Sequence, residues 1–114
     1  MPFIRTTTTE HITPEKEIML KEEFGKAISL VSGKAECYLM LSFTGDTMMA
    51  YQGDNKTPMA MVEVQLLGES DAGELDSLTG ALTAALEKIL GISPARIYVN
   101  HAFYTHWGVG GHNV

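Results

Sequence analysis

The sequence of 114 residues is short of cysteine and of long apolar runs, and each shortage excludes a class of protein. A single cysteine, Cys37, excludes the internal disulfide framework that many small secreted domains need. No apolar run is long enough to cross a bilayer, and no charged-then-apolar leader opens the chain. We therefore expect a cytoplasmic protein without a membrane segment.

Positive charge is also scarce. Eight Lys and Arg residues stand against 14 Asp and Glu residues, which gives a formal net charge of −6. This balance argues against nucleic acid or an anionic membrane surface as a partner. His101, His106 and His112 match no standard zinc spacing. We expect neither a metal nor another cofactor.

What is present is the composition of one globular domain over residues 1–114, with 45% apolar and 19% charged residues. Thr13 and Pro14 predict the start of an amphipathic helix that Gly33 ends, and Gly91 ends a second helix. Alternating or continuous apolar residues predict strands, which we place at residues 2–8, 38–43, 48–51, 59–67 and 96–100.

The two halves of the chain repeat. Gly33 and Gly91 lie 58 residues apart, and the same offset carries the apolar face of the first helix onto that of the second. The halves, about residues 2–56 and 57–114, both read as strand–helix–strand. We therefore predict an α/β (α+β) fold: a duplicated β-α-β unit whose four-stranded mixed sheet has two helices on one face.

The second face of this sheet has no cover. The strands are apolar almost throughout, which is typical of burial on both faces, and no third helix is left in the chain. We expect another copy of the protein there, in a ring of sheets around an axis or in a simple dimer.

The start of the chain, Met1-Pro2, offers a chemical group that no internal residue has. Cells usually remove Met before Pro, which would leave Pro2 as a free secondary amine. Burial and a nearby cation such as Lys34 would lower its pKa from near ~8, so that it could act as a general base. The alternatives are structural: Pro2 begins a strand, Lys34 complements a helix end, Asn100 is a turn residue and Tyr98 belongs to the core.

Three motifs together resemble the macrophage migration inhibitory factor branch of the tautomerase superfamily. They are Met1-Pro2 before a strand, Ser32-Gly33-Lys34 after the first helix, and Ser93-Pro94-Ala95-Arg96-Ile97-Tyr98-Val99-Asn100 after the second. The resemblance covers nearly the whole chain. It implies a homotrimer with active sites between subunits, and substrates that are small enolisable α-keto acids such as phenylpyruvate, or dopachrome.

The resemblance also implies roles for single residues. Pro2 would be the catalytic base, Lys34 would hold the substrate carboxylate, and the main chain of Leu67 would add a hydrogen bond. Asn100 would reach in from the neighbouring chain with Tyr98 beside it. We expect an aromatic pocket wall, for which the sequence offers Tyr38, Phe3, Tyr98 and Phe103.

Two segments depart from the family pattern. Residues 59–62, Met-Ala-Met-Val, stand where vertebrate members have Cys-x-x-Cys, so no thiol–disulfide activity is expected. Trp107 comes a few positions before the family's tryptophan, and Gly111 takes its place, so the pocket wall is expected to differ.

Two other functions stay open at this point. The first is a non-catalytic, cytokine-like binding protein of the same fold, which the resemblance implies would be released without a signal peptide. The second is another superfamily reaction, dehalogenation or decarboxylation, which would use Arg5 and Arg96.

Overall fold

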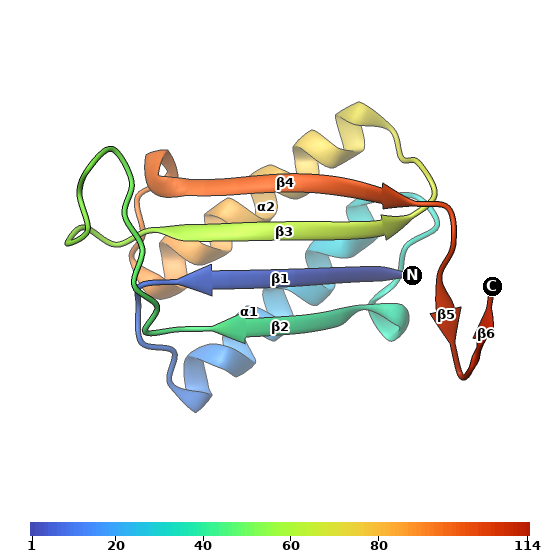
Figure 1. Ribbon diagram of the computed structural model, residues 1–114, viewed down its shortest axis with the longest axis horizontal. Helices are drawn as coiled ribbons and strands as arrows, with labels where there is room; N and C mark the ends of the chain where they lie inside the picture. The colour runs from blue at the N-terminus through green and yellow to red at the C-terminus, as the bar shows by residue number, and fades with distance from the viewer.

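The computed structural model describes residues 1–114 as a four-stranded mixed sheet with two helices on one face (Figure 1). The strand order is β2–β1–β3–β4, and a small hairpin of β5 and β6 ends the chain. The elements are β1 Pro2–Thr8, α1 Pro14–Ala27, β2 Met40–Thr44, β3 Ala60–Leu67, α2 Ala72–Leu90, β4 Ile97–Tyr104, β5 Gly108–Val109 and β6 His112–Asn113. The predicted fold class is confirmed.

The register of the strands follows the 58-residue offset. β1 pairs in parallel with β2, with Phe3 opposite Met40, and β3 pairs in parallel with β4, with Met61 opposite Tyr98. The two helices also begin 58 residues apart. Since β1 and β3 run antiparallel at the centre, the two β-α-β units are related by an approximate twofold rotation.

Side chains and glycine place the helix ends. The Thr13 hydroxyl accepts a hydrogen bond from the Lys16 N–H at the start of α1, and the Asp71 carboxylate accepts one from the Glu74 N–H at the start of α2. Gly91 ends α2 in the left-handed region, at φ +70°, which a residue with a Cβ rarely adopts.

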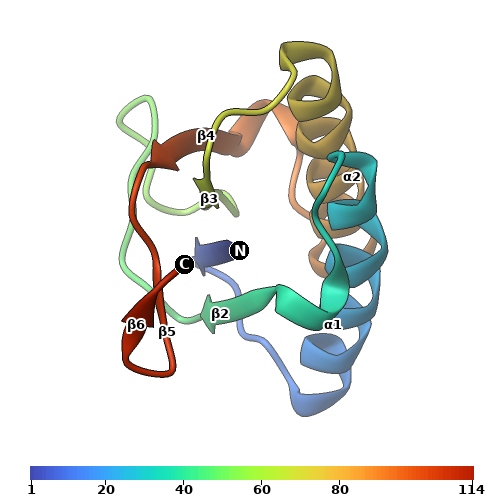
Figure 2. The same ribbon diagram turned by 90° about the vertical axis from the view of Figure 1, so that its right-hand side faces the viewer.

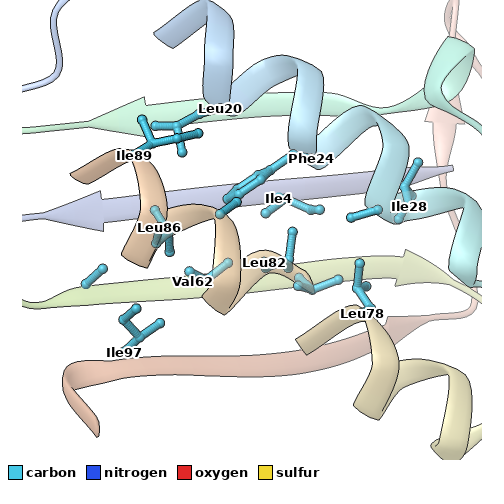
Figure 3. Close-up of a cluster of buried hydrophobic side chains, with 14 of the residues drawn as sticks. Ile4, Leu20, Phe24, Ile28, Val62, Leu78, Leu82, Leu86, Ile89 and Ile97 are labelled. Carbon is cyan, nitrogen blue, oxygen red and sulfur yellow. The ribbon is translucent and has the colours of Figure 1, made fainter. Parts of the chain in front are cut away.

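The core lies between the helices and the sheet (Figure 3). Phe24 of α1 and Leu82 of α2 lie over Ile4 and Val62 of the two central strands, and all four side chains are fully buried. β3 alternates strictly between buried and half-buried residues, as a strand with one covered face should. No helix of the structure is both long and apolar enough to span a bilayer.

Three local predictions were wrong. α1 ends at Ala27, before Gly33, and a 3₁₀ turn over Ile28–Leu30 follows it. β2 begins at Met40 because a second 3₁₀ turn occupies Glu36–Tyr38. Residues 48–51 form no strand, since they pair with no other strand of the chain and make only an isolated bridge.

We expected the sheet face that the helices leave uncovered to be apolar. This was wrong at the centre of that face. Arg5 and Glu63 face each other there across β1 and β3, with the Arg5 Nε 2.9 Å and Nη2 3.1 Å from the two Glu63 carboxylate oxygens. We had treated β3 as one apolar run, and this concealed the alternation of its side chains between the two faces of the sheet. The uncovered face is therefore mixed, with a charged pair at its middle.

Candidate active site

Pro2 is the first residue of β1 and is buried, at the end of the sheet where the chain begins (Figure 1). A cavity of about 680 Å³ opens beside it. Two of the predicted wall residues, Phe3 and Tyr38, line this cavity together with Met1 and Pro2. The sheet supplies its floor, and the 3₁₀ turn before β2 supplies one side.

The C-terminal hairpin forms the outer wall. Trp107, Gly108, Val109 and Gly110 all line the cavity. Figure 2 shows the hairpin on the side of the sheet away from the helices, beside the N-terminus. The Trp107 ring packs against the Tyr104 ring at the end of β4 in a T-shaped arrangement, with 6.2 Å between their centroids. The early position of Trp107 thus still brings an aromatic side chain to the cavity.

Lys34 reaches the same end of the sheet. Gly33 turns the chain at φ +78°, and the Lys34 ammonium then donates a hydrogen bond of 2.8 Å to the carbonyl of Leu67, the last residue of β3. The N–H of Leu67 in turn donates to the carbonyl of Met1, at 3.1 Å. Lys34, Leu67 and the N-terminus thus form one connected group.

The chain-terminal amine has a perturbed pKa. Burial lowers the pKa of the Met1 amine from its ordinary value, and the positive charge of Lys34 lowers it further. Both effects favour the neutral amine, which is the form that can accept a proton.

Tyr98 and Asn100 lie elsewhere in the chain. Tyr98 is opposite Met61, which in turn pairs with Thr7, so it is five residues along the sheet from Pro2, or about 17 Å. Asn100 is opposite Glu63, at the middle of the sheet. Phe103, which was also considered for the wall, does not line the cavity.

The comparison with protein families gives a match over residues 1–113, to macrophage migration inhibitory factor (MIF). The chain belongs to the MIF family. Among curated proteins, none matches the chain.

Solved structures of the MIF family agree with this assignment. MIF2 of Leishmania major is 31% identical, covers 100% of this chain and 97% of its own, and superposes with a TM-score of 0.93. A MIF homologue from Prochlorococcus marinus is 26% identical over 97% of each chain, with a TM-score of 0.85. A third protein, solved after inactivation by 2-oxo-3-pentynoate, is 20% identical over 97% of this chain and 95% of its own, with a TM-score of 0.82, and shares the fold.

Sequence reasoning within the MIF family pattern missed several residues of the cavity: Cys37, Met40, Gln65 and Val109. Strand register could have found two of them. Because Phe3 lies opposite both Met40 and Gln65, any cavity beside Phe3 includes these neighbours. The Gly-Gly pair between Val109 and His112 is likewise typical of a hairpin turn, which predicts that the chain folds back after Trp107.

Proposed function

We propose that the protein is a tautomerase that interconverts the keto and enol forms of small α-keto acids such as phenylpyruvate, with dopachrome as a second candidate substrate. The Pro2 amine, exposed by removal of Met1, is the general base. The observation that carries this proposal is the hydrogen-bonded link from Lys34 through Leu67 to Met1. Met1 and Pro2 themselves line a cavity large enough for an aryl keto acid.

Removal of Met1 moves the amine one residue inward. Pro2 is the next residue and lies buried at the same end of the sheet, so we expect burial to lower the pKa of its amine, as it lowers that of the Met1 amine. Lys34 stays beside it. Both effects favour the neutral secondary amine, which is the form that serves as a base.

Removal of Met1 also frees a donor. The Leu67 N–H, which the Met1 carbonyl now occupies, becomes available to a carboxylate oxygen of the substrate. Lys34 lies one hydrogen bond away, on the carbonyl of the same residue, and supplies the opposite charge. Hydrogen bonds of this charge-assisted kind are among the stronger ones in proteins.

The reaction is a proton transfer. The Pro2 amine takes a proton from the carbon next to the ketone, and the electron pair of that C–H bond forms the new C=C bond. The carbonyl oxygen takes up the negative charge, which hydrogen-bond donors stabilise. The protonated amine then returns the proton to that oxygen, which gives the enol and restores the base.

The proposal requires a second copy of the chain. Tyr98 and Asn100 lie too far from Pro2 to act with it in one chain, and both edge strands of the sheet, β2 and β4, lack a neighbour. A homotrimer in which each chain lends Tyr98 and Asn100 to the next would complete three sites. The Asn100 amide would then serve as one of the donors to the enolate oxygen.

The first test combines the mass of the mature N-terminus with a phenylpyruvate tautomerisation assay. We expect a protein that lacks Met1 and is active, and a Pro2→Gly variant that is folded and strongly impaired. Absence of turnover over a panel of enolisable α-keto acids, with Met1 removed, would contradict the proposal and favour a non-catalytic MIF-like binding protein.

A second test labels the base directly. 2-Oxo-3-pentynoate is an electrophilic alkyne, and a neutral amine adds across it without loss of any atom. We expect one adduct on Pro2 in protein without Met1, and none there at low pH, where the amine is protonated. Cys37 also lines the cavity and is exposed, so its thiol is a competing nucleophile. The matched control is therefore Cys37→Ser, in which Pro2 should be labelled to the same extent.

A further inference from the structure

The end of the sheet opposite Pro2 carries a second ordered cluster, around Tyr98. The Tyr51 and Tyr98 rings pack in a T-shaped arrangement, with 5.1 Å between centroids and 77° between planes. The guanidinium carbon of Arg96 lies 5.3 Å from the centroid of the same Tyr51 ring. Tyr51 is therefore held between Arg96 and Tyr98.

The guanidinium of Arg96 donates its hydrogen bonds to backbone carbonyls of one loop. Its side chain is only 12% exposed. Its Nε donates to the Pro58 carbonyl at 3.1 Å, and its Nη2 lies 3.3 Å from the carbonyls of both Asp54 and Thr57. The Asp54 carboxylate is 3.9 Å from Nη1. One buried cation thus holds residues 54–58 against the start of β4.

Hydrogen bonds within the loop stabilise it as well. The Asp54 carboxylate accepts from the N–H groups of Lys56, at 2.8 Å, and of Thr57, at 3.1 Å, and from the Thr57 hydroxyl. Tyr51 and Asp54 also exchange backbone hydrogen bonds of 3.0 Å each. Arg96 consequently fixes Tyr51 through a rigid loop, and not only through ring contact.

Tyr98 gains rigidity from this arrangement although it is 56% exposed. A tyrosine this exposed would ordinarily change rotamer freely, whereas the ring of Tyr51 limits its positions. Interaction with the Tyr51 side chain also raises the pKa of the Tyr98 hydroxyl above that of an ordinary tyrosine, which is already protonated near pH 7. An exposed, ordered, protonated phenol is suited to contact with a molecule outside the chain.

We propose that Tyr51 and Arg96 are positioning residues, which hold Tyr98 in place to close the substrate cavity of a neighbouring copy. This inference rests on the proposed function, since it gives Tyr98 a substrate to contact. It adds residues that touch no substrate themselves. Their role is to lower the cost of ordering Tyr98 when the substrate binds.

The test compares Tyr51→Leu, which removes the ring, with Tyr51→Phe, which keeps it. We expect the KM for phenylpyruvate to rise about 2- to 10-fold in Tyr51→Leu, the value of one aromatic contact, with kcat less affected. Tyr51→Phe should stay close to the unchanged protein. Arg96→Lys, which retains the charge but cannot reach three carbonyls, should resemble Tyr51→Leu.

A double-mutant cycle separates positioning from general damage. In a Tyr98→Ala background, Tyr51→Leu should have no further effect on KM, because the side chain that Tyr51 is proposed to position is gone. Full additivity of the two substitutions, or an unchanged KM in Tyr51→Leu, overturns the inference.

A readout that needs no turnover separates this inference from the proposed function. NMR of ring-labelled tyrosine follows the titration of Tyr98, which we expect to move toward that of an ordinary tyrosine in Tyr51→Leu. If the unchanged protein proves inactive, the proposed function fails. The positioning of Tyr98 by Tyr51 is still tested by this titration, because the titration needs no turnover. An unchanged titration overturns it.

Discussion

Lys34 acts on two partners at once. Its ammonium donates to the Leu67 carbonyl, and its charge lowers the pKa of the chain-terminal amine. The first contact places a cation where a substrate carboxylate would bind, and the second favours the base in its neutral form. If the proposed function holds, this one side chain links substrate binding to the protonation of the base, and one variant tests both.

The pH dependence of kcat/KM follows from this link. Burial and the charge of Lys34 lower the pKa of the Met1 amine, and we expect the same direction for the Pro2 amine once Met1 is removed. Because a base is active above its pKa, the rate should rise with pH along a single limb. In Lys34→Met the limb should shift to higher pH, and kcat/KM should fall about 10- to 100-fold, the value of a charged hydrogen bond. An unshifted limb would contradict this account. Lys26→Met, on the exposed end of α1, is the matched control.

We predict that Met1 affects substrate binding as well as catalysis. Because its carbonyl occupies the Leu67 N–H, protein that retains Met1 should bind phenylpyruvate poorly, in addition to lacking the base. Processed Pro2→Gly keeps that N–H free and should bind while turning over slowly. Trp107 is the only tryptophan and lines the cavity, so its fluorescence reports binding. Equal affinity of protein that retains Met1 and of processed Pro2→Gly would show that the Met1 carbonyl does not block the binding of substrate to the Leu67 N–H.

At the scale of elements, the second helix shows how backbone conformation decides what a residue contributes. α2 contains Gly80 in its interior, on the exposed side with open space around it, and ends at Gly91 in the left-handed region. Glycine loses more backbone freedom on folding than alanine, so it weakens a helix interior, whereas at a left-handed C-terminus it avoids strain.

Alanine substitutions at these two glycines should therefore have opposite effects. We expect Gly80→Ala to raise the free energy of unfolding by about 0.5–1 kcal/mol. Gly91→Ala should lower it by roughly 1–2 kcal/mol, the cost of a left-handed conformation for a residue with a Cβ. Urea unfolding at one protein concentration checks both. Two shifts of the same sign would mean that packing, not backbone conformation, governs these positions.

At the scale of the whole molecule, the proposed site is spread over both ends of the sheet. The cavity with Pro2 lies at one end and Tyr98 lies toward the other, so the proposal calls for a second copy to bring them together. The mixed uncovered face, with Arg5 and Glu63 at its centre, fits a ring whose sheets surround a polar middle better than a dimer with a dry interface.

Complementation between variants tests this assembly. Pro2→Gly and Tyr98→Ala should each lower activity alone, whereas a 1:1 mixture assembled together should regain about one quarter of the sites, those that draw both intact residues from different chains. Light scattering should give the mass of three chains. No gain on co-assembly would place Pro2 and Tyr98 in unrelated sites. Co-assembly of each variant with the double variant is the control, because it should restore nothing.

Much of the fold was predictable because it depends on local signals. Thr13 and Gly91 mark helix ends through hydrogen bonding and backbone conformation, and both act over a few residues. The repeat made the rest follow, since one β-α-β unit implied the other. The burial of β2 and β3 was harder to predict, because an apolar run does not tell which residues alternate toward the helices.

The candidate site was predictable in part. Pro2 and Lys34 stood out as chemical groups in known motifs, and the structure brings them to one end of the sheet. Trp107 reaches the cavity only because the hairpin folds back, and Tyr51 meets Arg96 only because a loop of irregular shape is held between them. Contacts of this kind join residues that no local pattern relates.

The sequence by itself determined the presence of the two helices, the duplicated unit and the candidate chemical groups, because these depend on periodicity, capping and residue type. Only the tertiary structure decided which of those groups meet. Strand register brings Lys34 and Leu67 to the chain terminus and leaves Tyr98 about 17 Å along the sheet. Register is a long-range property, set by the packing of whole faces, and a one-residue shift would have reversed every side chain on the strand.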